Sequence, residues 1–467
     1  MAQQDISQII YENYPKYKSA EFEKKRFGHD ELKNQIEKLV DNKAFKVETA
    51  GYSLEKREIF LIKAGTGKIK VLLWSQMHGD ESTATMALFD IFNFLASNDD
   101  LNEIRKDLLS KLQIYFIPML NPDGAELFQR RNALDIDLNR DALRLQFPES
   151  QILKAVKDSV NPTFAFNLHD QSTRYSTGNS FKSATISFLA PAFNYEKEIN
   201  EVRGNTMKLI VDLYHALNKF IPGHIAKYND DFEPRAFGDN FIKWGTSSVL
   251  IESGGWKNDQ EKQFIRKLNF VAILSGLNSI ANGGYKKADI KEYEKIPFND
   301  KLIFDLLLRN LTIEKNGEQY LIDVGINQEE IFSKNKSDSY FESKIEDWGD
   351  LSIFYGHEEL DLTGYKIKES KIFEEDTSSS RKLSHKDLIK KGFGFIRVND
   401  LPIDLEYSDS ALNLIKVGTN INLEPGYQKF ANFTVWNNNQ LVYNIINGFI
   451  YNVDADINKY NNGLIFR

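Results

Sequence analysis

Up to about residue 290, the sequence alternates short apolar runs with longer amphipathic segments. Five runs bounded by turn or polar residues are predicted to be buried strands: Val71–Ser75, Leu112–Met119, Thr163–Leu168, Thr185–Ala190 and Ser247–Ile251. Four segments between them are predicted to be helices: Ser82–Ser97, Pro148–Val160, Glu196–Phe220 and Asn258–Ala281. This alternation favours an α/β fold, with a mixed, mostly parallel sheet and helices on both faces. In such sheets, ligands and active sites lie where strands end and loops begin.

The sequence pattern changes at a charged stretch, Lys286–Lys301. Beyond it, two pairs of short strand-like runs separated by turn residues predict β-hairpins: Leu311–Ile313 with Tyr320–Val324, and Phe433–Trp436 with Leu441–Ile446. The polar segment Lys366–Lys386 is predicted to be a mobile loop or an excursion between strands. We therefore expect an α/β domain at residues 1–285 and a smaller, β-rich accessory domain at residues 286–467.

Composition excludes several classes of site and partner. The chain of 467 residues contains no cysteine and has a net charge of −8. Disulfides, iron–sulfur clusters and cysteine nucleophiles are therefore excluded, and a metal must be held by His, Asp, Glu or water. The acidic balance gives no general attraction for nucleic acid or anionic membranes. The apolar runs are also shorter than the ~18 residues of a membrane-spanning helix. We therefore expect the protein to bind neither nucleic acid nor a membrane.

The N-terminal segment bears on cellular location. Met1–Lys18 lacks the basic start and long apolar run that are typical of a secretory signal. We therefore expect a cytoplasmic protein, and a secreted one if a leader has been removed. The sequence does not predict an oligomeric state.

The segment Val71–Ser82 contains the strongest signal for chemistry. A predicted strand ends there, a glycine turn follows, and His78 and Glu81 lie three residues apart across that turn. This spacing allows an imidazole and a carboxylate to point at one ion, although a surface histidine beside a helix-start glutamate is the alternative. Among the seven histidines, His169 has the best position for a third ligand because it ends another predicted strand. Two histidines and one glutamate with an open fourth position form a catalytic zinc site.

Two further groups of polar residues accompany these three. The pair Arg130–Arg131 precedes the run Asp135–Arg140, which itself ends in an arginine. The planar guanidinium groups suit carboxylates and oxyanions, although a charged surface segment is the alternative. Glu252 ends the predicted strand Ser247–Ile251 and is followed by Ser253 and two glycines. Burying a carboxylate costs several kcal/mol unless it is paired. Beside a zinc-activated water, Glu252 would be a general base; an edge or helix-capping carboxylate is the alternative.

In this order, the motifs resemble those of the zinc carboxypeptidase family, which includes the pancreatic carboxypeptidases. The resemblance covers about residues 25–285 and rests on these elements: Gly51–Ile59, His78 with Glu81, Asn121–Gly124, the pair Arg130–Arg131, Asp137–Arg140, His169 and Glu252. It implies a carboxypeptidase-like α/β fold and one Zn²⁺ ion per chain. It also implies hydrolysis of the C-terminal peptide bond of peptides by a zinc-activated water.

The resemblance also implies roles for individual residues. His78, Glu81 and His169 would bind zinc, and Asp137 would accept a hydrogen bond from the other ring nitrogen of a zinc-bound histidine, which we expect to be His78. Arg130 would stabilise the oxyanion that develops during the reaction, and Glu252 would be the general base.

The implied substrate-binding residues follow the same order. Asn139 and Arg140 would grip the terminal carboxylate of the substrate, and Tyr228 would close over it. Arg235 lies in the segment expected to form the side-chain pocket, where it would favour acidic C-terminal residues. A salt bridge within its loop, or a position facing solvent, is the alternative for Arg235.

Two other functions remain open on the sequence. One is an N-acyl amino acid deacylase that resembles aspartoacylase and succinylglutamate desuccinylase, a group that shares the His-x-x-Glu motif, the Asn–Arg pair and a distant histidine. The other is a non-catalytic binding protein on the same fold. The Asn121–Gly124 turn and Glu252 favour the peptidase. The expected partner is a peptide, or a small acylated amino acid, with a free carboxylate.

Overall fold

The computed structural model describes residues 5–333, 338–374 and 383–467. The chain folds into two compact units, Met1–Lys301 and Leu302–Arg467. The first unit thus extends beyond residue 285, where the sequence analysis put the boundary. Helix α10 (Ile290–Lys295) belongs to it because the buried Tyr293 accepts a hydrogen bond at its hydroxyl from the backbone N–H of Ala190. Strand β10 (Asn299–Asp300) pairs with β6 (Ser176–Thr177) of the same unit.

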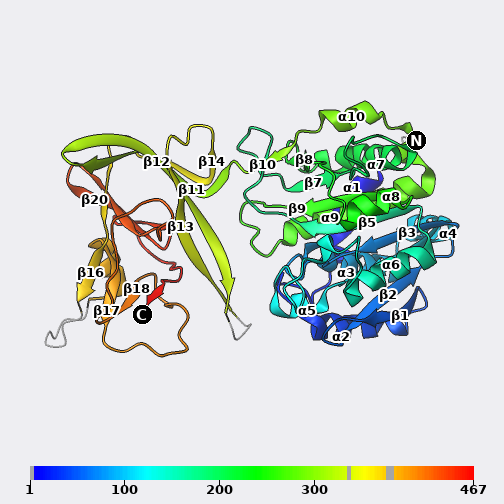
Figure 1. The fold of residues 1–467 in the computed structure, drawn as a ribbon, viewed down its shortest axis with the longest axis horizontal. Coiled ribbons are helices and arrows are strands. Elements are labelled where there is room, and N and C mark those ends of the chain that lie inside the picture. Colours follow the sequence, from blue (N-terminus) through cyan, green and yellow to red (C-terminus); the bar gives the residue numbers. More distant parts are fainter. Residues whose placement is uncertain (1–4, 334–337, 375–382) are drawn as a thin grey trace. The chain divides into compact units, whose positions relative to one another are not determined.

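A mixed eight-stranded sheet forms the centre of the first unit (Figure 1). Its spatial order is β1 (Phe45–Tyr52), β2 (Glu58–Ala64), β4 (Leu112–Ile117), β3 (Ile69–Trp74), β5 (Phe164–Asp170), β9 (Ser247–Ser253), β7 (Ile186–Leu189) and β8 (Ile225–Lys227). The central strands β4, β3, β5 and β9 are parallel, whereas the pairs β1–β2, β2–β4 and β7–β9 are antiparallel. All five predicted strands are present, and the predicted α/β fold is confirmed.

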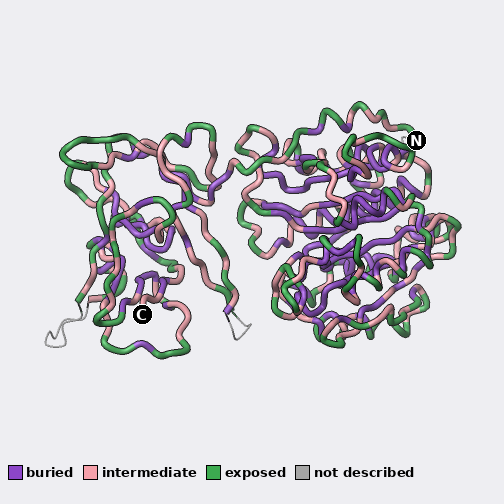
Figure 2. The backbone as a smooth tube through the Cα atoms, viewed as in Figure 1, coloured by how far each residue is buried: buried purple, intermediate pink, exposed green. Residues whose placement is uncertain are grey.

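Helices cover both faces of this sheet. One face packs against α1 (Ile6–Asn13), α2 (His29–Val40), α3 (Thr83–Ala96), α4 (Asn102–Lys111), α7 (Glu201–Asn218) and α9 (Gln263–Asn282), and the other against α6 (Pro148–Val160) and α8 (Phe237–Lys243). Successive side chains of a strand point to opposite faces, so Val71 and Leu73 join the first core and Leu72 and Trp74 join the second. The central strands β3, β5 and β9 are therefore buried over most of their length, and Figure 2 colours the middle of this unit as buried.

Two of the predicted helices begin later than expected. Helix α7 begins at Glu201 because the Asn200 side chain accepts a hydrogen bond from the backbone N–H of Arg203 and so caps the helix. Helix α9 begins at Gln263 because Lys262 has a left-handed backbone, with φ of 55°. The short helical elements η1 (Tyr14–Lys16), α5 (Pro122–Leu127), η2 (Leu138–Arg140) and η3 (Gly284–Lys287) complete this unit. No helix in the described part of the chain has the length and apolar character needed to cross a membrane.

The second unit is rich in β-structure, as predicted. Its larger sheet has the order β13 (Ser339–Gly349), β12 (Glu318–Phe332), β11 (Ile303–Lys315), β15 (Lys366–Glu369), β19 (Phe433–Asn437), β20 (Gln440–Ile446) and β21 (Phe449–Asn452), and β14 (Tyr355–Asp361) also pairs with β11. The smaller sheet contains β16 (Lys371–Glu374), β17 (Phe393–Val398), β18 (Asn413–Lys416) and β22 (Ile465–Phe466), with α11 (His385–Lys390) packed nearby. Both predicted hairpins, β11–β12 and β19–β20, are present.

The prediction of a loop over Lys366–Lys386 is wrong at its start. Lys366–Glu369 forms β15, and Lys371–Glu374 forms β16. Strand β15 pairs with β19, and its Ile367 packs on the core of the larger sheet, so one apolar side chain in an alternating polar run suffices for a strand. Residues 375–382 of the predicted loop lie outside the described residues.

Candidate active site

A tight turn between β3 and α3 carries His78 and Glu81. The turn lies at the carboxyl end of a central parallel strand, the position expected for functional residues in an α/β sheet. Gly79 packs directly on a second turn, because a Cβ atom at this position would lie 2.0 Å from the backbone carbon of Gly124. Glycine is therefore required at this close approach of two backbones.

The second turn, Asn121–Gly124, is itself fixed by the early motif Gly51–Ile59. The buried Asp123 accepts hydrogen bonds from the Ser53 hydroxyl at 2.7 Å and from Nη1 of Arg57 at 2.8 Å. These two motifs, which are distant in the sequence, are therefore bonded to each other and pack against the turn that carries His78. Their part is structural, since they hold the backbone against which Gly79 packs.

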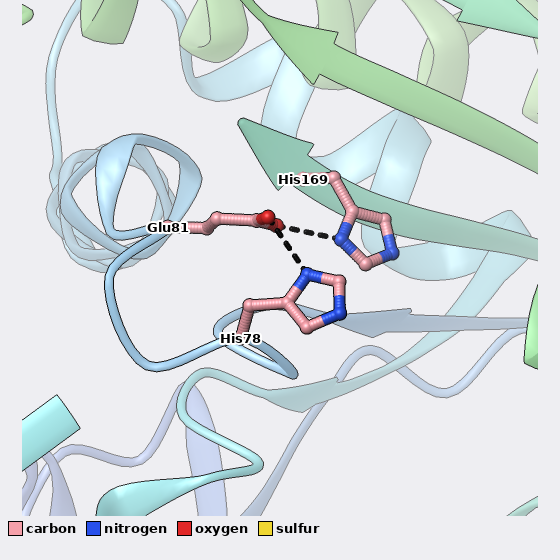
Figure 3. A group of neighbouring side chains, drawn as sticks. All are labelled: His78, Glu81 and His169. Atoms are coloured by element: carbon pink, nitrogen blue, oxygen red, sulfur yellow. Dashed lines mark hydrogen bonds and ion pairs between the residues drawn. The ribbon is translucent and has the colours of Figure 1, made fainter. Parts of the chain in front are cut away.

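His78, Glu81 and His169 converge in the structure (Figure 3). One ligand atom from each residue lies within 4.8 Å of the others, and all three residues are buried. The Glu81 carboxylate lies between the two imidazoles, with Oε1 2.7 Å from Nδ1 of His78 and Oε2 2.7 Å from Nδ1 of His169. His169 reaches this position because β5 pairs in parallel with β3.

The donor set of this cluster fits zinc. Two imidazole nitrogens and a carboxylate oxygen are zinc ligands, and three protein ligands leave a position for water or substrate. The other ring nitrogen of His78, Nε2, lies 3.0 Å from Oδ1 of Asp137. Such a carboxylate fixes the tautomer and the orientation of a metal-binding histidine.

The surroundings shift the pKa values of the two imidazoles in opposite directions. Burial lowers the pKa of His78, but the charge of Glu81 and the hydrogen bond to Asp137 outweigh it and raise that pKa to about 9. For His169, burial prevails over the charge of Glu81 and lowers the pKa. The pKa values differ because the His78 ring contacts two carboxylates, those of Glu81 and Asp137, whereas the His169 ring contacts that of Glu81.

Arg130 spans the carboxylates of the cluster. Its Nη1 lies 3.1 Å from Oε1 of Glu81, and its Nη2 lies 3.0 Å from Oδ2 of Asp137. Burial lowers the pKa of Arg130, but the charges of Glu81 and Asp137 raise it above its ordinary value. The side chain is 44% exposed, so this fixed cation faces both the cluster and solvent.

Glu252 lies on the strand next to His169. In the parallel pair β5–β9, His169 and Glu252 are in register, so their side chains leave the same face of the sheet. Burial and the negative charge of Glu81 raise the pKa of Glu252 well above its ordinary value. An acid therefore lies close to the cluster without belonging to it.

Asn139 and Arg140 lie in the short turn η2. Oδ1 of Asn139 accepts a hydrogen bond from the backbone N–H of Phe237 at 2.9 Å, which joins this turn to α8. Nε of Arg140 lies 3.3 Å from Oε2 of Glu233. The same Glu233 carboxylate accepts hydrogen bonds from Nε and Nη2 of Arg235 at 2.9 and 2.7 Å. Arg235 thus forms a salt bridge within its loop, and its side chain is 55% exposed.

Tyr228 follows β8 and is half-buried. Its hydroxyl lies 3.4 Å from the hydroxyl of Tyr175. Burial, this contact and the charge of Glu252 raise the pKa of Tyr228. The structure therefore brings Tyr228 into the electrostatic surroundings of Glu252.

Sequence reasoning missed two residues of this region, Glu233 and Tyr175. Glu233 is two residues before Arg235, and this spacing is the signal for their salt bridge. No sequence pattern near Tyr175 or Tyr228 indicates their contact, because the two residues are far apart in the sequence and come together only when the chain folds.

Comparisons with known proteins point to one family. The sequence model of the family described as zinc carboxypeptidase matches residues 33–208. Carboxypeptidase 2 of Trichophyton tonsurans is 29% identical over 140 residues, 30% of this chain and 25% of that protein; the enzyme of the same name from Trichophyton rubrum is 30% identical over 135 residues, 28% of this chain and 24% of that protein. The match thus spans about a quarter of these relatives. A metallo-carboxypeptidase structure from Burkholderia cenocepacia has a TM-score of 0.46 and 16% identity, covering 56% of this chain and 70% of that chain.

The matched segment contains the whole cluster. His78, Glu81 and His169 all lie within residues 33–208, as do Arg130, Asp137, Asn139 and Arg140. Residues 33–208 of this chain are therefore similar to the zinc carboxypeptidase family, and this similarity covers every residue of the cluster.

Proposed function

We propose that the N-terminal unit is a zinc-dependent metallocarboxypeptidase that hydrolyses the C-terminal peptide bond of peptides. The observation that carries this proposal is the convergence of His78, Glu81 and His169 on one point, with Glu252 in register on the adjacent strand. The family match and the carboxypeptidase names of its relatives support it.

Three polar side chains near the cluster have a task in the proposed reaction. When bound, zinc supplies a Lewis acid that makes a water nucleophilic near neutral pH. Glu252 accepts a proton from this water and passes it to the leaving amine nitrogen. The Arg130 guanidinium faces the carbonyl oxygen as this oxygen gains negative charge. One well-placed donor of this kind stabilises the transition state by about 3–4 kcal/mol. Asp137 holds the His78 ring in place.

The substrate's C-terminal carboxylate binds on the side of Asn139 and Arg140. The Arg140 side chain is 39% exposed, so its guanidinium is accessible to a substrate. The neighbouring Asn139 side chain is held in place by the backbone N–H of Phe237. A free carboxylate is bound far better there than an amide, because a substrate carboxylate carries a charge that the guanidinium can pair with and a substrate amide does not. Tyr228, beside Tyr175, covers the bound chain end. Arg235 is not assigned to the pocket, because it forms a salt bridge with Glu233 within its loop.

A peptide assay tests this proposal against its alternative. The zinc-loaded protein is incubated with N-blocked dipeptides, with the same dipeptides amidated at the C-terminus, and with N-acyl amino acids, each with and without a chelator. We expect release of the C-terminal amino acid from the free-carboxylate dipeptides alone, and loss of this activity with the chelator. Cleavage of N-acyl amino acids alone would identify a deacylase. No cleavage of any of the three would leave a binding protein.

Replacement of His169 by alanine tests the metal site directly. Loss of an outer hydrogen-bond partner lowers metal affinity by about 10–100-fold, so loss of a ligand atom should exceed this. We expect His169→Ala to lose zinc on dialysis while the wild type keeps it, measured by elemental mass spectrometry. His215→Ala is the matched control, because His215 pairs with Glu292 on the surface and its side chain is 58% exposed. Equal zinc content in all three proteins would place the third ligand elsewhere.

Replacement of Arg140 by alanine tests the recognition of chain ends. A hydrogen bond to a charged group contributes about 1.5–3 kcal/mol, which corresponds to a rise in KM of roughly 10–100-fold. We expect this rise for free-carboxylate substrates and little change for any residual turnover of amidated ones. Arg131→Ala is the control, because Arg131 is an exposed neighbour whose Nη1 donates to the backbone oxygen of Asp135. An equal rise for both substrate classes would argue against anchoring by Arg140.

A further inference from the structure

Lys262 is a buried lysine that precedes α9, and it contacts the backbone just after Glu252. The residue is 8% exposed. Its Nζ donates hydrogen bonds to the backbone oxygens of Ser253 and Gly254 at 3.1 and 2.5 Å. Burying an ammonium group is costly unless it is well bonded, so these contacts account for its position. Two consecutive carbonyls directly after Glu252 are therefore held by one fixed cation.

The same ammonium also lies close to the neighbouring strand end. Its Nζ is 3.9 Å from Oδ2 of Asp170, the residue that follows His169. Asp170 accepts a hydrogen bond from the Thr83 hydroxyl at 2.5 Å, and its backbone N–H donates to Oε2 of Glu81 at 3.2 Å. Asp170 and Ser253 are paired in the β5–β9 register. Lys262 thus connects the end of the strand that carries Glu252 with the end of the strand that carries His169.

The backbone around Lys262 and Gly254 has little freedom. Lys262 has a φ of 55°, in the left-handed region that residues other than glycine rarely adopt. With this backbone, the side chain turns inward and its ammonium group reaches the two carbonyls. On the other side of the turn, a Cβ atom at Gly254 would lie 2.0 Å from the backbone oxygen of Ala184. The segment after Glu252 is therefore held between Lys262 and the backbone at Ala184.

We propose that Lys262 is a positioning residue, whose ammonium group fixes the backbone after Glu252 and so aims the Glu252 carboxylate at the His78–Glu81–His169 cluster. Lys262 acts through Ser253, Gly254 and Asp170. Within the described residues, its ammonium group makes no hydrogen bond or ion pair with the cluster His78–Glu81–His169. Its effect on turnover rests on the proposed peptidase function. Its effect on the backbone does not.

The first test replaces Lys262 by methionine, which keeps the length of the side chain and removes the charge. Misplacement of a catalytic group by about 1 Å can lower turnover by roughly 100-fold, so we expect kcat to fall by about 10–100-fold. KM and zinc content should stay close to those of the wild type. Lys157→Met is the matched control: Lys157 is also buried, at 7% exposure, and its Nζ donates to the backbone oxygen of Trp244 at 3.3 Å. This control should keep the wild-type kcat.

Two further variants cover the case in which Lys262→Met does not fold. Lys262→Gln keeps one donor for a carbonyl and lacks the charge, and Lys262→Arg keeps the charge. We expect the glutamine variant to resemble methionine in kcat and the arginine variant to recover most of the activity. Wild-type kcat in Lys262→Met or Lys262→Gln would overturn the proposal. Failure of both to fold, or an equal loss of kcat in Lys157→Met, would show that Lys262 is merely structural.

Hydrogen exchange separates this proposal from the proposed function. The backbone N–H of Gly254 donates to the oxygen of Thr185 at 2.9 Å, so its exchange reports on the segment after Glu252. In the zinc-loaded proteins, peptides that cover 250–256 should exchange faster in Lys262→Met than in the wild type or Lys157→Met. If the wild type hydrolyses no peptide, the proposed function fails while this measurement still decides on Lys262. Unchanged exchange would overturn the positioning role even in an active enzyme.

Discussion

Replacement of Glu252 by glutamine is expected to lower kcat for peptide hydrolysis by about 100- to 10,000-fold while zinc remains bound. Glutamine has the shape of glutamate, but its amide cannot accept a proton at neutral pH. Zinc should remain because the cluster consists of His78, Glu81 and His169, and Glu252 is outside it. Initial rates on a free-carboxylate dipeptide and elemental analysis of the dialysed protein check both parts.

The control for this variant is Glu103→Gln on the protein surface. The Glu103 side chain is 86% exposed and pairs with Lys106, so the substitution should leave turnover unchanged. Turnover near the wild-type value in Glu252→Gln would reject the general-base role. Loss of zinc together with turnover would instead indicate that Glu252 supports the metal site.

The second large effect concerns stability. Asp90 and Arg266 form an ion pair whose side chains are both 0% exposed. Arg266 also donates to the backbone oxygens of Ser19 and Phe22, which ties the N-terminal segment to α9. Replacing Arg266 by methionine leaves the Asp90 carboxylate buried without its cation, which costs about 3–5 kcal/mol of unfolding free energy. Equilibrium denaturation of the first unit, followed by circular dichroism, measures this loss.

The surface pair of Lys106 with Glu103 again supplies the comparison. Lys106 is 72% exposed, and exposed ion pairs contribute about 0–1 kcal/mol, so Lys106→Met should change the unfolding free energy by less than about 1 kcal/mol. A similarly small loss in Arg266→Met would mean that the Asp90 carboxyl is readily accommodated without a cation. Burial already raises the pKa of Asp90 even with Arg266 present. Part of the lost unfolding free energy in Arg266→Met should therefore be the cost of protonating Asp90.

The central strands of the sheet could be predicted from the sequence because they are buried on both faces. Parallel strands such as β3 and β5 appear as nearly continuous apolar runs, which are easy to recognise. The edge strand β1 was missed because most of its residues are exposed or half-exposed, so apolar side chains are few. Strand β15 was missed for the same reason, since Ile367 is its single apolar residue.

The candidate metal ligands could be predicted because histidines are rare in this chain and two of them end strands or begin turns. The residues that surround them could not. Glu233 contacts Arg140 across two separate loops, and Lys262 contacts Asp170 from the start of a distant helix. These pairings depend on how the strands and loops meet, and no local pattern of residue types records that arrangement.

The register of β5 and β9 also limits how this domain can vary in length. His169 and Glu252 share a face because the two strands are aligned residue by residue. A single residue inserted within β9 before Glu252 would turn its carboxylate to the opposite face of the sheet, which is covered by α3, α7 and α9. Insertions in surface loops carry no such penalty. Length changes in natural or engineered variants should therefore accumulate in the loops and be absent from β9.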